Sequence, residues 1–149
     1  MTVAPAPLPH SGPARAAAWT LAAAGTLPFF AGITDVSVLG RTSLGAVHIY
    51  GAVIASFVCG IHWGAALFSP GGMALRLFVA SNVAALLAWG AALLSPRPGF
   101  LLLAAVFAGL LLVDRQLRQS GLWPDWFWTL RVTISTVVIG ACLWIGIAA

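Results

Sequence analysis

The residues that could do chemistry are few in this chain, and two of them, His48 and His62, share one long apolar segment. The sequence holds three His, three Asp, seven Arg and two Cys, and it contains no Lys or Glu. On a helical wheel, both imidazoles fall within one stripe of about 80° that also carries small side chains. Those small residues are Gly51, Ala55, Cys59 and Ala66. His62 could carry protons or hold a ligand, because imidazole titrates near neutral pH. We favour the alternative that it bonds to a neighbouring helix and stabilises packing.

Four further polar residues are candidates for the same region: Asn82, Asp114, Arg115 and Arg131. If neighbouring segments are antiparallel helices, His62 and Asn82 lie about 9 and 12 Å from the same end of the bundle and could face each other. Asp114 leaves one segment at that end and Arg131 enters the next, which predicts an ion pair between them. Polar groups inside a membrane are costly, so this set is the candidate for ligand binding or proton handling.

The remaining charges are expected nearer to water. Asp125 and Arg118 could form a second, more solvated ion pair. Asp35 and Arg41 are interpreted as solvated loop charges.

Metal binding and enzymatic catalysis are poorly supported by these residues. His48 and His62 are about 21 Å apart along one helix, so they cannot share a metal ion. Cys59 and His62 could supply two ligands, but no second cluster completes a site. Catalytic motifs such as HExxH or a nucleophile elbow are absent from the sequence. We therefore expect no metal, no cofactor and no enzyme activity, and we interpret Cys59 and Cys142 as buried small hydrophobes.

The elements that must position these residues are membrane-spanning helices. The chain is 61% hydrophobic and 7% charged, against about 25% charged residues in an average soluble domain. Such a chain cannot build a water-facing surface, so the sequence predicts an all-α, polytopic integral membrane bundle of about five helices in a lipid bilayer. The predicted spans are 16–33, 44–67, 74–94, 100–117 and 127–147.

The predicted domain organisation is a flexible tail, 1–13, followed by one membrane domain, 14–149. Pro28 should bend or end the first helix, because proline lacks a backbone donor. A cleaved signal sequence is the alternative reading of this first segment.

Short connections and the placement of arginine predict the topology. The breaks at 70–72, 96–99 and 121–124 are tight, so adjacent helices run antiparallel. Five arginines fall at the end that holds the N-terminus and two at the other, which favours a cytoplasmic N-terminus and a periplasmic C-terminus in a bacterial inner membrane. The arginines stand singly, a pattern that disfavours nucleic-acid binding.

Ser56, Gly60 and Gly64 form a small-xxx-small stripe on the segment 44–67. Such a stripe lets helix backbones approach closely. We slightly favour its use inside the bundle, and a homo-oligomer or another membrane protein is the alternative.

Three strings resemble one known family: SFVCGIHWG from Ser56 to Gly64, DRQL from Asp114 to Leu117, and GLWPDWFWTLRVTIST from Gly121 to Thr136. They are similar to the signature segments of the domain of unknown function 3429, a family that includes transmembrane protein 69-like proteins. The resemblance implies a helical integral membrane protein and carries no activity. The matching positions are His62, Trp63, Gly64, Asp114, Arg115, Pro124, Trp126, Leu130 and Arg131.

Together these observations predict a non-enzymatic bundle that assists a membrane complex or binds a small ligand in a polar pocket at one end. The alternative is a small proton-coupled transporter or channel that uses His62.

Overall fold

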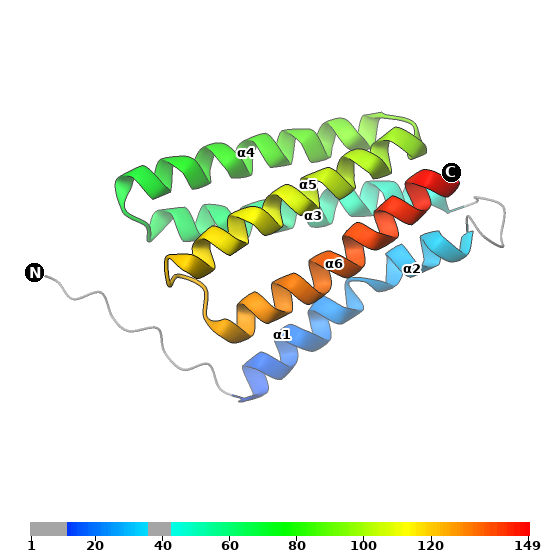
Figure 1. Cartoon of the computed structure of the whole chain (residues 1–149). Coiled ribbons are helices and arrows are strands. Elements are labelled where there is room, and N and C mark those ends of the chain that lie inside the picture. Colours follow the sequence, from blue (N-terminus) through cyan, green and yellow to red (C-terminus); the bar gives the residue numbers. More distant parts are fainter. Residues whose placement is uncertain (1–11, 36–42) are drawn as a thin grey trace, which may run out of the picture.

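Six helices form one elongated bundle in the computed structural model, which describes residues 12–35 and 43–149. Neighbouring long helices run antiparallel, joined by short connections (Figure 1). Their bounds are α1 Gly12–Ala24, α2 Leu27–Thr34, α3 Leu44–Leu67, α4 Gly71–Leu93, α5 Pro96–Gln119 and α6 Asp125–Ala148.

Five helical spans in the described residues are long and apolar enough to cross a membrane, with α1 and α2 together making the first. The protein is therefore a multi-span helical membrane protein. The predicted segment 44–67 matches α3 at both ends. The other spans extend beyond their predicted limits by up to four residues, except that α4 ends at Leu93, one residue before the predicted limit. Helix α1 begins at Gly12, two residues inside the predicted tail, whereas residues 1–11 lie outside the described part.

The first span is broken at Gly25 and Thr26, just before Pro28, as the proline predicted. Pro28 lies in the first turn of α2, where its missing donor costs nothing. The hydroxyl of Tyr50 on α3 donates to the Gly25 carbonyl at 2.9 Å and satisfies an acceptor that the break exposes. The break lets α2 pack against α3 and α6 while α1 contacts mainly α6.

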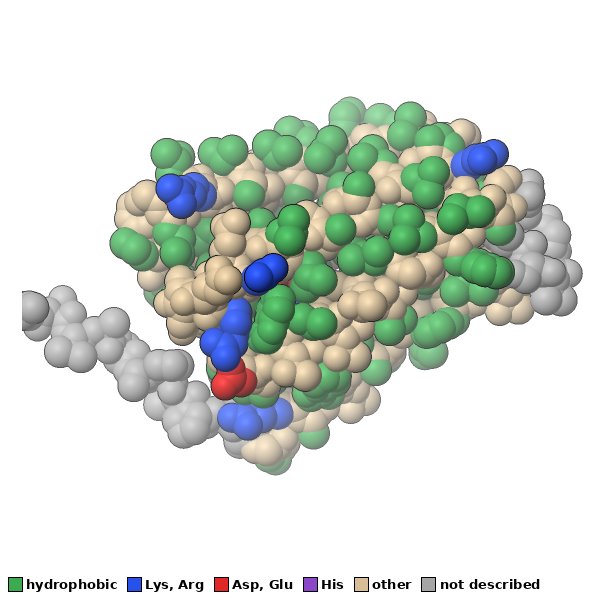
Figure 2. All heavy atoms as spheres, in the orientation of Figure 1, with side chains coloured by type: hydrophobic (Ala, Val, Ile, Leu, Met, Phe, Trp, Pro, Cys, Tyr) green, Lys and Arg blue, Asp and Glu red, His purple; other side chains and the backbone are tan. Residues whose placement is uncertain are grey.

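The core lies between α3, α5 and α6, with α2 closing one side. Helix α4 packs on α3 and α5 and buries a smaller share of its length. Hydrophobic side chains cover the length of the bundle, and most of the charged side chains seen in this view lie toward the end at which α1 begins (Figure 2). The end at which α1 begins, called here the Arg-rich end, carries Arg15, Arg76, Arg115 and Arg118.

Two interpretations from the sequence are wrong. The Ser56, Gly60 and Gly64 stripe faces outward, since a Cβ on either glycine would meet nothing within 4 Å, so it does not pack the bundle internally. Asp35 is fully buried and accepts a hydrogen bond from the Ser43 amide at 2.6 Å, so it is not a solvated loop charge. Arg41 lies outside the described residues.

Candidate functional site

The carboxylate of Asp114 is the centre of a buried polar cluster near the Arg-rich end. Asp114 is fully buried on α5 and accepts three hydrogen bonds. Nε of Arg131 donates to Oδ2 at 2.7 Å, while Nε2 of His62 and the indole Nε1 of Trp123 donate to Oδ1 at 2.8 and 2.9 Å. A carboxylate accepts only, so His62 carries a proton on Nε2 in this arrangement. The cluster joins α3, α5, α6 and the connection between the last two.

A tight turn after α5 brings Trp123 back to Asp114. Gly121 follows the C-cap of α5 with φ of 79°, a left-handed conformation that glycine adopts without penalty. The amides of Leu122 and Trp123 both donate to the Leu117 carbonyl, and Pro124 then begins the turn into α6. This local sequence, Gly-Leu-Trp-Pro, folds the indole onto the carboxylate nine residues upstream.

Two polar atoms of the cluster are buried and have no hydrogen-bond partner in the described part of the chain: Nδ1 of His62 and Nη2 of Arg131. The Arg131 residue is only 7% exposed. A buried guanidinium that uses one donor on Asp114 keeps others available for an acceptor. An unpaired buried polar atom costs free energy, so these two atoms mark the place where a ligand could bind.

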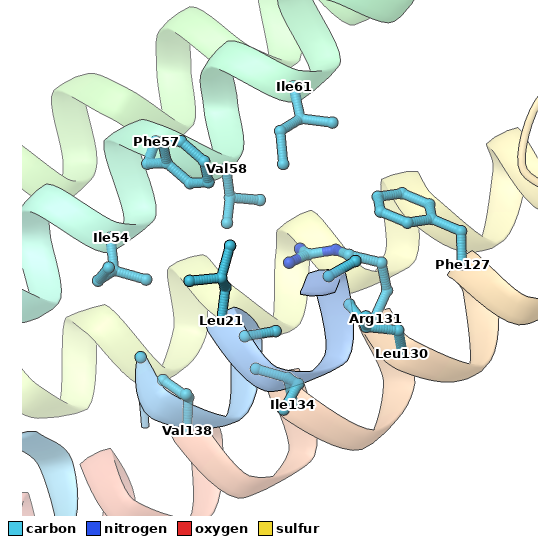
Figure 3. A pocket seen from close by; sticks show the side chains of 13 residues that line it. Leu21, Ile54, Phe57, Val58, Ile61, Phe127, Leu130, Arg131, Ile134 and Val138 are labelled. Atoms are coloured by element: carbon cyan, nitrogen blue, oxygen red, sulfur yellow. The ribbon is translucent and has the colours of Figure 1, made fainter. Parts of the chain in front are cut away.

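Arg131 lines a pocket of about 390 Å³ between α1, α3 and α6. Its walls are apolar, and its guanidinium points in among these side chains (Figure 3). The pocket exists because α1, beyond the break at Gly25, packs mainly on α6 and leaves a space beside α3. The other lining residues are Ala18, Leu21, Ala22, Gly25, Ile54, Phe57, Val58, Ile61, Phe127, Leu130, Ile134 and Val138.

Residues 14–148 match the family described as Protein of unknown function (DUF3429). The chain belongs to this family. No curated protein and no solved structure matches the chain.

The structure brings together three of the five residues predicted for ligand or proton handling in this DUF3429 protein. His62 and Arg131 both contact Asp114, and the predicted ion pair between Asp114 and Arg131 is present. The predicted pair of Arg118 and Asp125 is also present, at the exposed surface.

The other two predicted residues lie elsewhere. Asn82 does not face His62: its side chain is exposed, and its amide nitrogen donates to the Phe78 carbonyl of its own helix at 2.7 Å. The preceding residue, Ser81, is the buried one, because one residue turns a helix by 100° and moves Asn82 to the outer face. Arg115 is exposed at the end of α5, outside the cluster.

The residues predicted as motif or packing positions lie outside the cluster. Trp63 is 46% exposed and packs edge-on against Phe78. Pro124 precedes α6, and Trp126 stacks under Arg15, whose guanidinium carbon lies 5.6 Å from the ring centroid. Ser56, Gly60 and Gly64 lie on the outer face of α3.

Sequence reasoning missed the role of Trp123, which was not among the predicted site residues. The feature of the sequence that could have indicated this role is Gly121, which permits a tight turn between Asp114 and Trp123. His48, on the same stripe as His62, is buried at the opposite end and stacks on Phe100 with ring centroids 4.9 Å apart.

Proposed function

We propose that this DUF3429 protein is a non-enzymatic membrane protein that binds a small lipophilic ligand in the pocket lined by Arg131. The observation that carries the proposal is the buried Nη2 of Arg131, which has no partner in the described residues although its side chain lines an otherwise apolar pocket. Ligand pockets combine apolar walls with a few well-placed polar groups and typically measure about 300–1000 Å³.

The openings of the pocket support a ligand that arrives from the bilayer. Leu21 and Phe57 line it and are 72% and 68% exposed, so the pocket reaches the outer surface of the bundle. Helix α1, which forms one wall, has no buried residues and could shift at the break to admit a ligand.

The test is purification of the full chain from its membrane in mild detergent, followed by native mass spectrometry and identification of the molecules that dissociate. We expect a lipophile that is retained by the parent protein and lost in Arg131→Met. The matched control is Arg115→Met, because Arg115 is an exposed arginine outside the cluster. Equal retention by all three proteins would contradict the proposal, and a second protein that copurifies in place of a lipophile would favour the assembly of a membrane complex.

Proton-coupled transport is the second candidate, favoured by the buried and unpartnered Nδ1 of His62. A packed apolar layer weighs against it, since Leu103, Phe107 and Leu110 of α5 are at most 2% exposed and lie between the levels of His48 and His62. If the imidazole carries protons, His62→Ala should abolish proton flux in proteoliposomes. Absence of flux in the parent protein would remove this candidate.

For the orientation, we propose that the Arg-rich end faces the cytoplasm. Arg15, Arg76, Arg115 and Arg118 lie at this end and Arg97 at the other, an asymmetry that agrees with the positive-inside rule.

A further inference from the structure

We infer that the ligand of this pocket is an uncharged lipophile with a carbonyl oxygen at one end, such as a long-chain ketone, an ester or a quinone, and that the pocket discriminates against acids. This inference rests on the proposed function, because it names the chemical class of the same ligand. It follows from the charge, the free donor and the shape of the site.

The charge of Arg131 is already compensated. The guanidinium forms a 2.7 Å ion pair with Asp114, and Trp123 adds no charge. His62 donates through the one proton on Nε2, and its Nδ1 has no acceptor for a second proton among the described residues. The buried cluster is then neutral. A carboxylate or phosphate ligand would add an uncompensated negative charge to a low-dielectric site, and burial of an unpaired charge is strongly unfavourable. A neutral head avoids this cost.

The unpartnered group beside the pocket is a donor. Nη2 of Arg131 carries two N–H groups, and a guanidinium has no acceptor. Arg131 is the one residue among those lining the pocket that has a polar side chain. The site therefore fits a head that accepts a hydrogen bond and a body that is otherwise apolar, which describes a carbonyl on a hydrocarbon.

The shape of the pocket indicates where the carbonyl head and the apolar body of the ligand would lie. Arg131 lies about 9 Å along α6 from its first residue, and Val138, at the other end of the lining, lies about 10 Å deeper. A 30 Å hydrocarbon core has its midplane about 15 Å from either surface. The carbonyl of the ligand would therefore lie close to the lipid headgroups, and its hydrocarbon chain would extend toward the middle of the bilayer.

The experiment compares two probes of equal chain length, 2-tridecanone and tridecanoate, by native mass spectrometry of the full chain. The measurements are made at pH 8, well above the ordinary pKa of a carboxylic acid. We expect the ketone to bind at least about tenfold more tightly than the acid, because only the acid adds charge to the neutral cluster. Ala22→Phe, which fills the pocket from α1, should abolish ketone binding. The matched control is Ala24→Phe, since Ala24 is exposed on the same helix and does not line the pocket.

A charge variant tests the reason for the selectivity. Asp114→Asn leaves Arg131 without its counterion, so the preference should reverse toward tridecanoate. Where this variant does not fold, Arg131→Met provides the second measurement, and it should bind the ketone no better than tridecane.

Each outcome distinguishes the two proposals. Tighter binding of the acid by the parent protein, abolished by Ala22→Phe, would overturn the preference for a neutral head and leave ligand binding in this pocket standing. Binding of both probes that Ala22→Phe does not change would overturn the pocket itself and with it the proposed function.

Discussion

The carboxylate of Asp114 on α5 connects this helix to α3 and α6 through three hydrogen bonds. Its three partners, His62, Trp123 and Arg131, come from α3, the α5–α6 connection and α6. Removing one member of a buried ion pair leaves the other charge uncompensated, a larger cost than the pair itself contributes. The residues of this cluster should therefore be sensitive to changes that leave surface charges unaffected.

Asp114→Asn should lower the free energy of unfolding by about 3 kcal/mol or more, because it leaves Arg131 buried and uncompensated. Unfolding by a denaturing detergent, followed by circular dichroism, measures the change. The matched control, Asp125→Asn, removes the exposed partner of Arg118 and should cost less than about 1 kcal/mol. Equal losses in the two variants would show that the Asp114 pair is not buried in the membrane.

Trp123→Phe should lower the free energy of unfolding by about 1–2 kcal/mol, since phenylalanine keeps an aromatic ring and loses the indole N–H that donates to Asp114. The same unfolding assay applies. Trp128→Phe is the control, because Trp128 is not among the three partners of Asp114. A loss in the control as large as that in Trp123→Phe would contradict a specific contribution of the bond from the indole to Asp114.

At the scale of the elements, two interruptions of the helical pattern position the site. The break at Gly25 and Thr26 separates α1 from the packed part of the first span, and the pocket occupies the space that results. The turn at Gly121 ends α5 and directs Trp123 onto Asp114. Both features arise from local backbone chemistry, a proline without a donor and a glycine with positive φ.

Gly121→Ala should cost about 1–2 kcal/mol, because an L-residue with a Cβ is strained in the left-handed region that this turn requires. The measurement is again the free energy of unfolding. Gly140→Ala is the matched control, since Gly140 is an exposed helical glycine with open space around its Cβ position and alanine favours helix there. The prediction fails if both substitutions are neutral or stabilising.

Across the whole molecule, the two ends of the bundle differ in chemistry. The Arg-rich end holds the Asp114 cluster, whereas the opposite end is closed by tight packing of α5 on α3 and α4. Gly99 in the first turn of α5 lies directly on the His48 ring, and a Cβ there would overlap His48 and approach the Ala91 carbonyl. The close contact leaves no room for a Cβ at residue 99, so this position requires glycine.

Gly99→Ala should destabilise the bundle by about 1–3 kcal/mol, since overpacking forces the helices apart. His48→Ala in the same chain removes the overlapping ring and should recover part of the loss. A double-variant cycle in the unfolding assay measures the coupling. Strict additivity of the two substitutions would mean that His48 is not the obstacle.

The orientation is testable by labelling single cysteines introduced at exposed arginines of the two ends. In intact bacterial cells, a maleimide that does not cross the inner membrane should label Arg97→Cys and should label Arg76→Cys only after permeabilisation. The native cysteines, Cys59 and Cys142, are both buried and provide little background. The reverse pattern would place the Arg-rich end in the periplasm.

The sequence by itself determined the membrane class, the five spans, the tight connections and the break near Pro28. Each depends on local properties: the length of an apolar run, the missing donor of proline and the flexibility of glycine. The pair of Asp114 and Arg131 was also predictable, because a short connection brings the end of one helix and the start of the next together.

Only the tertiary structure decided which faces meet. His62 reaches Asp114 and Asn82 does not, although both were placed at similar depth, because helix rotation and not depth selects the buried face. In a chain that is apolar on all sides, the hydrophobic pattern cannot identify this face. The pocket beside Arg131 depends further on how α1 leaves the bundle, which is set by contacts between segments more than 100 residues apart in the sequence.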